Sequence, residues 1–254
     1  MNTGRKIALL TAAGIAERFG GLMAKEMYPL GFEKNQDGKT VPVPISKYTF
    51  DALRQIKPDF FTFVVRSDKP QILRYYGDGK SFPENIMYLV QDDPISQYVS
   101  MSRIRDFMQD GDTIYYAMPD TAIHPNSLFV DLDTVHNEKK ADITIGLFEV
   151  DEPEHFTTVE LDKDGGFVVA EVKPEKPTTN WIWGVLVFNE RFFEMGDDLG
   201  AEKVGAVGSD DVGAVLNHAA KSGLKVACHK IKGGRYRDFA NFERVVGFIQ
   251  DATI

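Results

Sequence analysis

The sequence predicts an α/β fold: a Rossmann-like, mostly parallel sheet flanked by helices, with a small antiparallel section in the second half. Two observations support this prediction. In the first half, short apolar runs alternate with longer amphipathic stretches, and strands that alternate with helices pair in parallel because each helix returns the chain across the sheet. In the second half, strand-like runs follow one another closely, which favours antiparallel pairing through short turns.

The first half supplies the parallel strands and the helices between them. Strands are expected at Ile7–Thr11, Phe60–Val65, Ile86–Val90, Thr113–Met118 and Ile143–Val150. Helices are expected at Ser46–Ile56, Lys69–Tyr76, Ser96–Met108 and Ser127–Lys139. In the last of these, Leu128, Leu132 and Val135 recur at spacings of four and three, so they share one helix face. Gly31–Pro44 is expected to form an exposed loop.

The second half is organised differently. Strands are expected at Thr157–Leu161, Phe167–Val172 and Trp181–Phe188, and the linker Asp162–Gly166 joins the first two through Asp-Gly and Gly-Gly pairs that suit a tight turn. Helices near Asp210–Ser222 and Asn241–Ile249 flank a strand at Leu224–Lys230. The sequence shows no internal repeat and no interdomain linker, so a single domain over residues 1–254 is expected.

Composition excludes several classes of protein. The chain has 254 residues and a formal net charge of −9, which argues against a protein that coats nucleic acid by neutralising phosphates. Hydrophobic residues make up 43% and charged residues 26%, so wholesale disorder is excluded. A single cysteine, Cys228, excludes an intrachain disulfide and a cysteine-based zinc site. No apolar run approaches the roughly 20 residues of a membrane span, so a cytoplasmic protein without membrane contact is expected.

The first expected strand leads into a candidate phosphate-binding loop. It ends in Ala12-Ala13-Gly14, small residues whose backbone amides a phosphate can approach closely. Arg18 and Lys25 follow and add two cations. A polyphosphate ligand is one interpretation; an ordinary connection with solvated charges is the other. Residue types alone leave both open.

Other common motifs are absent from the sequence. Ala16 stands where a dinucleotide-binding G-x-G-x-x-G would have its second glycine, which disfavours a nicotinamide-dependent oxidoreductase. Gly38-Lys39-Thr40 lacks the earlier glycine of a Walker A loop, because Glu33 takes that position. The five histidines are scattered, and no G-x-S-x-G elbow occurs. Acyl transfer and histidine-based metal chemistry therefore have no support.

Two aspartates follow expected strands. Asp120 comes after the apolar run Thr113–Met118, and Asp238 lies in the late segment Gly233–Phe239. In open α/β sheets, ligands bind at the carboxyl ends of the strands. Each aspartate could instead cap a helix. As a pair they could hold a hard cation such as Mg²⁺, which prefers carboxylate oxygens.

Taken together, these motifs resemble the sugar-phosphate nucleotidylyltransferase family. Thr11–Arg18 (TAAGIAER) and Ala24–Leu30 (AKEMYPL) resemble its signature L-A-A-G-x-G-x-R followed by P-K-x-L-x-P-L. The short spacing from Arg18 to Lys25 is similar to that of the cytidylyltransferases of isoprenoid synthesis. Further resemblances follow in the family's order at Gln91, Met118–Thr121, Val159–Asp162, Val172–Pro174, Asn180–Phe188 and Arg237–Ala240.

The resemblance implies a Mg²⁺-dependent transfer of a nucleotidyl group, with a pyrimidine preferred, from a nucleoside triphosphate to a sugar 1-phosphate, releasing pyrophosphate. It implies catalytic roles for Arg18, Lys25, Asp120 and Asp238, of which Asp120 and Asp238 bind the metal. It implies nucleotide contacts from Ala12, Ala13, Gly14 and Gln91, and acceptor contacts from Lys173, Glu160, Asn180 and Gly184. The family's C-terminal β-helix module is not expected, and a homo-oligomer stays open.

Two alternatives remain at this stage. Ala16, Glu17 and Ala24 depart from the family's loop, which favours a catalytically silent nucleotide-sugar-binding protein. Trp181 and Trp183 lie two apart and so share one side of their strand. They could form a cage for a quaternary ammonium, as in a cytidylyltransferase for phosphocholine or a polyol phosphate, or they could pack in the core. The core interpretation is the favoured one.

Overall fold

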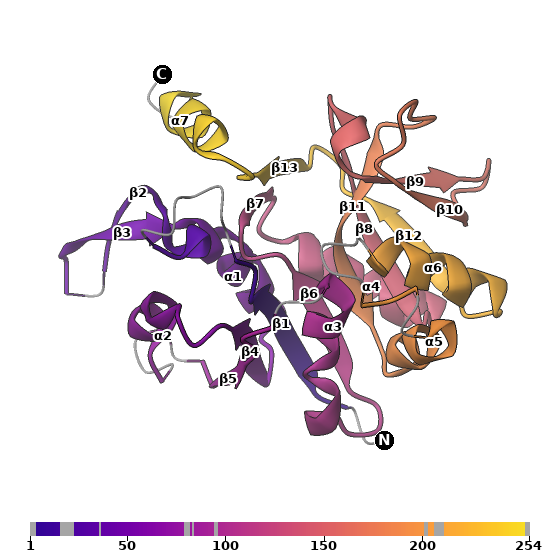
Figure 1. Cartoon of the computed structure of the whole chain (residues 1–254), viewed down its shortest axis with the longest axis horizontal. Coiled ribbons are helices and arrows are strands. Elements are labelled where there is room, and N and C mark those ends of the chain that lie inside the picture. Colours follow the sequence, from indigo (N-terminus) through magenta and orange to yellow (C-terminus); the bar gives the residue numbers. More distant parts are fainter. Residues whose placement is uncertain are drawn as a thin grey trace.

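A computed structural model describes residues 4–15, 23–35, 37–78, 82, 84–93, 96–200, 203–205 and 211–251. A central sheet runs through the described chain in the order β10-β9-β11-β6-β1-β4-β5, and β8 and β12 extend it from β11 (Figure 1). Its strands are β1 (Lys6–Ala12), β4 (Phe60–Val65), β5 (Ile86–Val90), β6 (Thr113–Ala117), β8 (Ile143–Glu149), β9 (Thr157–Leu161), β10 (Phe167–Val172), β11 (Trp181–Phe188) and β12 (Val226–Lys230).

The centre of the sheet is parallel, as the sequence predicts. β1 pairs in parallel with β4 and with β6, and β4 pairs in parallel with β5. The antiparallel section begins at β11, which runs opposite to both β6 and β8, and continues through the β9–β10 hairpin. The carboxyl ends of β1, β4, β5 and β6 therefore meet at one edge, where ligands bind in sheets of this kind.

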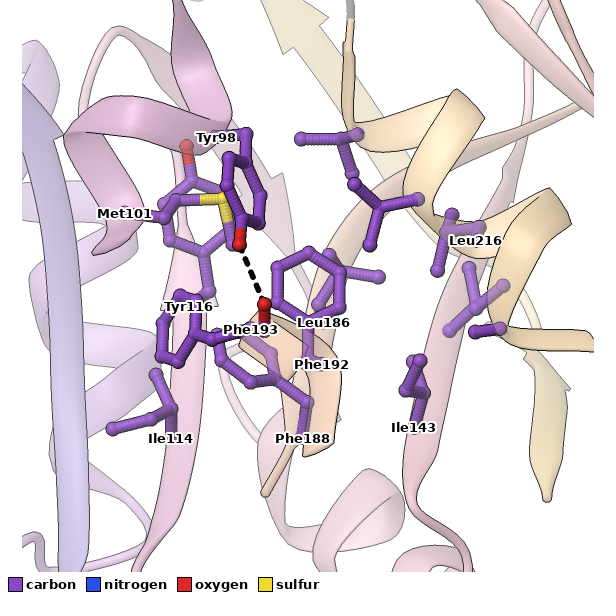
Figure 2. Packing of buried hydrophobic residues seen from close by; sticks show 14 of the residues in the cluster. Tyr98, Met101, Ile114, Tyr116, Ile143, Leu186, Phe188, Phe192, Phe193 and Leu216 are labelled. Carbon is purple, nitrogen blue, oxygen red and sulfur yellow. Dashed lines mark hydrogen bonds between the residues drawn. The ribbon is translucent and has the colours of Figure 1, made fainter. Parts of the chain in front are cut away.

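Helices cover both faces of the sheet. One face packs against α1 (Ile45–Arg54), α2 (Pro70–Tyr76) and α4 (Leu128–Lys139), and the other against α3 (Gln97–Ser102), α5 (Arg191–Leu199) and α6 (Asp211–Lys221). Alternation along β1 divides its side chains between these layers, with Leu9 in one core and Leu10 in the other. Figure 2 shows the core beneath α3, where the Tyr98 hydroxyl donates a 2.8 Å hydrogen bond to the carbonyl of Phe193.

Two small sheets lie outside the central one. Gly31–Pro44 is not a loop, and that prediction is wrong: β2 (Pro29–Lys34) and β3 (Thr40–Pro44) form an antiparallel hairpin. Its turn closes because the side-chain oxygen of Asn35 accepts the backbone N–H groups of Asp37 and Lys39, while Gly38 takes a positive φ of 75°. The second small sheet pairs β7 (Thr121–His124) with β13 (Arg235–Asp238).

A third apolar cluster joins these small sheets to α7 (Phe242–Asp251). It contains Leu30, Ile45, Ala122, Phe239 and Val245. Because Ala122 and Phe239 come from β7 and from the residue after β13, their burial holds this small sheet in place. None of the described helices is long and apolar enough to span a bilayer.

The helix expected over Ser96–Met108 is shorter in the structure. α3 ends at Ser102, and a 3-10 turn follows at Arg105–Phe107. The hydroxyls of Ser100 and Ser102 donate to the carbonyls of Ser96 and Val99. Such side-chain bonds compete with regular helix bonds, which explains the early end. Further 3-10 turns lie at Lys25–Met27 and Pro153–His155, and α5 is an element that the sequence did not predict.

Asp112 makes folding sensitive to acid. Burial raises the pKa of this carboxyl, but hydrogen bonds from the Arg5 side chain and from the backbone of Gln109 and Arg5 outweigh burial and lower it. A lowered folded-state pKa stabilises the fold above the unfolded value of about 3.9 and loses that contribution as pH falls further. We expect Asp112→Asn to lower the free energy of unfolding at neutral pH by about 1.5–3 kcal/mol.

Urea unfolding of both proteins, repeated at decreasing pH, checks this expectation. The stability difference between wild type and Asp112→Asn should be constant at neutral pH and shrink below about pH 4. A difference that stays the same through this acidic range contradicts the assignment.

Candidate active site

Pairing between β7 and β13 brings the two predicted aspartates together. Asp120 immediately precedes β7, and Asp238 is the last residue of β13, where it lies opposite Thr121. The backbone N–H of Phe239 donates to the carbonyl of Asp120 at 3.4 Å and continues this pairing. Residues far apart in the sequence are thus held side by side at the carboxyl end of β6.

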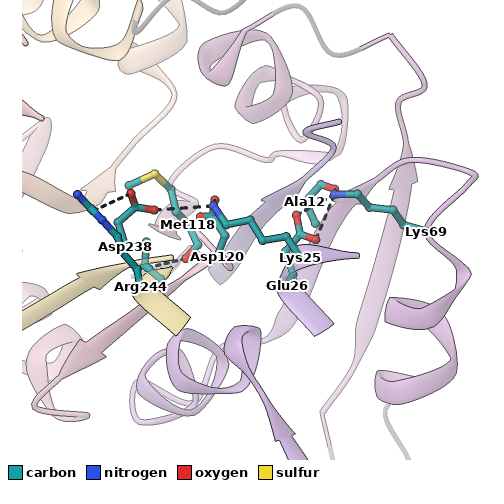
Figure 3. Close-up of polar contacts among 9 residues, drawn as sticks. Ala12, Lys25, Glu26, Lys69, Met118, Asp120, Asp238 and Arg244 are labelled. Carbon is teal, nitrogen blue, oxygen red and sulfur yellow. Dashed lines mark hydrogen bonds and ion pairs between the residues drawn. The ribbon is translucent and has the colours of Figure 1, made fainter. Parts of the chain in front are cut away.

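Lys25 lies between the two carboxylates. Its Nζ is 2.8 Å from Oδ2 of Asp120 and 3.8 Å from Oδ1 of Asp238 (Figure 3). Arg244 from α7 approaches the other oxygen of Asp238 at 3.4 Å and Glu152 at 3.6 Å. The Lys25 side chain is 12% exposed, whereas those of Asp120 and Asp238 are 32% and 23% exposed. The carboxylates therefore remain accessible to a ligand from solvent.

The electrostatics keep Lys25 and Asp120 ionised at neutral pH. Burial lowers the pKa of Lys25, but the attraction of Asp120 and Asp238 exceeds this effect and raises it. Burial raises the pKa of Asp120, but Lys25 outweighs burial and lowers it. A fixed positive charge thus faces fixed negative charge at the end of the sheet.

Neither aspartate caps a helix. Asp120 leads into strand β7, so no helix N-terminus follows it. At the start of α7, the side-chain oxygen of Asn241 accepts the backbone N–H of Arg244 and performs the capping. The interpretation of these aspartates as caps is wrong, and both carboxylates point instead toward Lys25.

Asp120 and Asp238 suit a magnesium ion that takes part of its ligands from the protein and the rest from water and a bound substrate. They are carboxylates on separate segments, and an oxygen of each lies within 4 Å of the Lys25 ammonium. Among the described residues, no group of three or more His, Cys, Asp or Glu is placed to hold a metal. Mg²⁺ commonly takes one or two carboxylates and completes its octahedron with waters and substrate phosphates. The pair suits that use better than a closed structural site.

The predicted nucleotide-binding residues line the same edge. Ala12 ends β1 and Ala13 follows it, both buried. Gly14 is exposed, and no described atom lies within 4 Å of the position that a Cβ would occupy. None of the described residues blocks the approach of a ligand to the backbone of Gly14. Arg18, together with Ala16 and Glu17, lies outside the described residues.

Gln91 lies directly after β5, two strands from β1. Its backbone N–H donates to the carbonyl of Val65 at 2.8 Å, and its side-chain amide donates to the carbonyl of Asp93 at 3.1 Å. The side-chain oxygen is buried and has no hydrogen-bond partner among the described residues. A buried acceptor without a partner is costly, and a ligand N–H would satisfy it.

The predicted acceptor-binding residues lie around the β9–β11 section. Glu160, Lys173 and Asn180 are exposed. The structure connects Lys173 to the aspartates by packing: its N–H donates to the carbonyl of Phe156, whose ring packs edge-on against Tyr236 at 5.9 Å. Tyr236 lies two residues before Asp238 on β13.

Gly184 has a packing reason to lack a side chain. A Cβ there would lie 2.6 Å from the ring of Phe148 and 3.0 Å from that of Tyr236. The glycine lets the ring of Tyr236 approach β11, which supports β13 and the aspartate at its end.

The two tryptophans pack in the core, as favoured from the sequence. Trp183 is buried, and Trp181 packs partly buried against the same cluster. The ammonium of Lys230 lies 4.5 Å from the centre of the Trp181 ring. This geometry gives no support to an open cage formed by the two rings.

Three charged residues of this region were not anticipated: Glu26, Lys69 and Arg244. Glu26 and Lys69 form a buried ion pair beside Lys25, and Arg244 contacts Asp238. The sequence offers little signal for them. Glu26 stands at a variable position of the AKEMYPL motif, Lys69 and Arg244 stand outside any motif, and charged residues at such positions are ordinarily solvated.

The described chain is an α/β protein of the class that binds ligands at the carboxyl edge of an open sheet, with small residues after its first strand and a lysine–carboxylate centre at that edge. The profile of the nucleotidyl transferase family matches residues 21–243. The chain therefore belongs to the nucleotidyl transferase family, as the sequence resemblance predicted.

Individual relatives agree with this assignment. The chain is 24% identical over 200 residues to the low-salt glycan biosynthesis nucleotidyltransferase Agl11 of Haloferax volcanii, covering 76% of this chain and 54% of that protein. It is 22% identical over 178 residues to glucose-1-phosphate thymidylyltransferase of Neisseria meningitidis, covering 70% of this chain and 58% of the other. The chain thus spans a little over half the length of these curated relatives.

A solved structure confirms the fold. A Bacillus anthracis protein assigned as a glucose-1-phosphate thymidylyltransferase, crystallised with sucrose, superposes with a TM-score of 0.83. The match covers 97% of this chain and 95% of the other, at 16% identity. At that identity the similarity concerns the fold alone.

Proposed function

We propose that this protein transfers a nucleotidyl group from a nucleoside triphosphate, preferably a pyrimidine nucleotide, to a sugar 1-phosphate and releases pyrophosphate. The observation that carries the proposal is the convergence of Lys25, Asp120 and Asp238 at the carboxyl edge of the sheet. The small-residue loop after β1 belongs to the same edge. This combination supports the proposal, because a triphosphate bound at this edge would face a cation and two carboxylates that could hold a metal ion.

The reaction needs no protein nucleophile. An oxygen of the acceptor phosphate attacks the α-phosphorus, and the bond from that phosphorus to the bridging oxygen of pyrophosphate breaks. Catalysis then rests on positioning and charge neutralisation. Lys25 and Arg18 would neutralise the charge of the departing pyrophosphate. Asp120 and Asp238 would hold Mg²⁺, which supplies positive charge to the phosphate oxygens when bound.

Gln91 supports a contact with the base. Its buried side-chain oxygen lacks a partner among the described residues, and the edge of a uracil or thymine ring offers an N–H that could donate to it. A ligand without a suitably placed N–H would leave this polar group unpaired, and that penalty lets a site discriminate between ligands. Purine rings also offer N–H donors, so Gln91 supports contact with a base, and the pyrimidine preference is proposed on the resemblance.

The acceptor is proposed to be a sugar 1-phosphate, contacted by Lys173. The name of the Neisseria meningitidis relative, glucose-1-phosphate thymidylyltransferase, supports this class. The tryptophans give no support to a quaternary ammonium acceptor, because Trp183 is buried and Lys230 lies over Trp181.

Pyrophosphate release tests the proposal. Each of UTP, dTTP, CTP, ATP and GTP is supplied with glucose 1-phosphate and Mg²⁺, and pyrophosphate is measured. We expect release with a pyrimidine triphosphate that depends on both acceptor and Mg²⁺. The proposal would be contradicted if a triphosphate binds but no pyrophosphate is released with glucose 1-phosphate or with a panel of other sugar 1-phosphates. That outcome would favour a catalytically silent nucleotide-sugar-binding protein.

A further inference from the structure

A buried ion pair lies beside the candidate active site and has no role in the steps above. The side chains of Lys69 and Glu26 are each 6% exposed. The Lys69 ammonium is 2.8 and 3.1 Å from the two carboxylate oxygens of Glu26, and it donates a third hydrogen bond to the carbonyl of Ala12 at 2.8 Å. An ammonium has three N–H donors, so each of them has an acceptor here.

The three partners come from separate segments of the active-site edge. Ala12 is the last residue of β1, where the expected phosphate-binding loop begins. Glu26 follows Lys25 in the 3-10 turn, and Lys69 precedes α2 after strand β4. One ammonium therefore ties the start of the loop to the turn that carries the catalytic lysine. Figure 3 shows Lys25 extending toward Asp120 while Glu26 extends the opposite way, toward Lys69.

The arrangement also keeps Glu26 away from Lys25. Without Lys69, the buried carboxylate of Glu26 would lose its ion-pair partner. It would then attract the ammonium of Lys25, its neighbour in the sequence, and compete with Asp120 for it. Burying such a pair is costly, and apolar residues of similar size often stabilise a fold equally well. Three directed hydrogen bonds, however, restrict orientation in a way that apolar contacts do not.

We propose that Lys69 is a positioning residue, which acts through Glu26 and Ala12 to orient Lys25 and the start of the loop toward the triphosphate. This inference rests on the proposed function, because it presumes that Lys25 and the loop bind a polyphosphate. Lys69 makes no hydrogen bond or ion pair with Asp120 or Asp238 in the contacts described above, although its positive charge also contributes to lowering the pKa of Asp120.

The test uses Lys69→Met and the double variant Glu26→Met/Lys69→Met. The single variant leaves a buried carboxylate unpaired and should melt at a lower temperature. The double variant replaces the pair by apolar groups and should regain much of that loss. Both should lose about 10- to 100-fold in kcat/KM, because small displacements of catalytic groups are costly. We expect KM for the triphosphate to rise because the start of the loop is displaced. We expect kcat to fall because Lys25 is displaced.

Lys47→Met is the matched control. Lys47 is a lysine of α1 that is 11% exposed and paired with Glu33 and Asp51, and it contacts none of the proposed catalytic residues in the ion pairs described. Its loss should lower stability and leave kcat/KM unchanged. A folded double variant whose kcat/KM stays within about twofold of wild type overturns the inference. If Lys69→Met does not fold, the double variant alone decides.

A binding measurement separates this inference from the proposed function. If the wild type transfers no nucleotide to any acceptor tested, the proposed function fails, and calorimetric titration with inorganic tripolyphosphate replaces the kinetic assay. Affinity about tenfold weaker in the double variant than in wild type supports the positioning role. Equal affinity in the two proteins overturns it.

Discussion

Replacing Asp120 by asparagine is expected to abolish nucleotidyl transfer and leave the fold intact. Asparagine keeps the size of the side chain but removes the charge that would hold Mg²⁺ and that pairs with Lys25 at 2.8 Å. Loss of one preorganised charge at a reacting phosphate costs on the order of 10²–10³ in rate. Pyrophosphate release under saturating triphosphate, acceptor and Mg²⁺ measures the effect, and circular dichroism with a melting curve checks the fold.

Asp133→Asn is the control for this variant. Asp133 is also a partly exposed aspartate paired with a lysine, 2.6 Å from Lys6, but it lies on α4, away from the carboxyl edge of the sheet. Its substitution should cost stability and leave turnover unchanged. Turnover by Asp120→Asn within about tenfold of wild type would remove Asp120 from the metal site.

Lys25→Met is expected to give the second large loss. Methionine keeps much of the length of the side chain but leaves Asp120 and Asp238 facing each other without the ammonium between them. The departing pyrophosphate also loses its neutralising charge, so turnover should fall by about 10²–10³-fold. The melting temperature should fall as well, because two partly buried carboxylates then repel each other.

A comparison with Lys25→Arg separates charge from position. Arginine restores the positive charge in a planar, longer group. We therefore expect it to recover the melting temperature and only part of the turnover. Equal turnover in wild type and Lys25→Met would show that this lysine neutralises the aspartates and takes no part in transfer.

Patterns within a few residues explain which elements could be predicted. β4 and β5 begin and end where expected, because each is a short run of mostly apolar residues (FFTFVV and IMYLV) in the parallel part of the sheet. β7 and β13 were missed because they have four residues each, and three of the four residues of β13 (RYRD) are charged. They form strands because they pair with each other over the third apolar cluster.

The residues of the site divide in the same way into those that local patterns predict and those that they do not. Lys25, Asp120 and Asp238 could be named from local motifs and from the family resemblance. Glu26, Lys69 and Arg244 could not, since nothing in their neighbourhood in the sequence marks a buried or paired charge. Gly184 was expected to contact the acceptor, and the structure shows that the rings of Phe148 and Tyr236 leave no room for a side chain there.

The apolar pattern of the sequence was sufficient to predict the layered α/β architecture, because the period of apolar residues sets which faces of helices and strands are buried. The sequence also indicated which charged residues the site contains, namely cations after β1 and aspartates near later strands. The contacts of Lys25 with Asp120, 95 residues away, and with Asp238 could be seen only in the folded chain. Strand order and the β7–β13 pairing bring these groups together, and such long-range packing leaves no local signal in the chain.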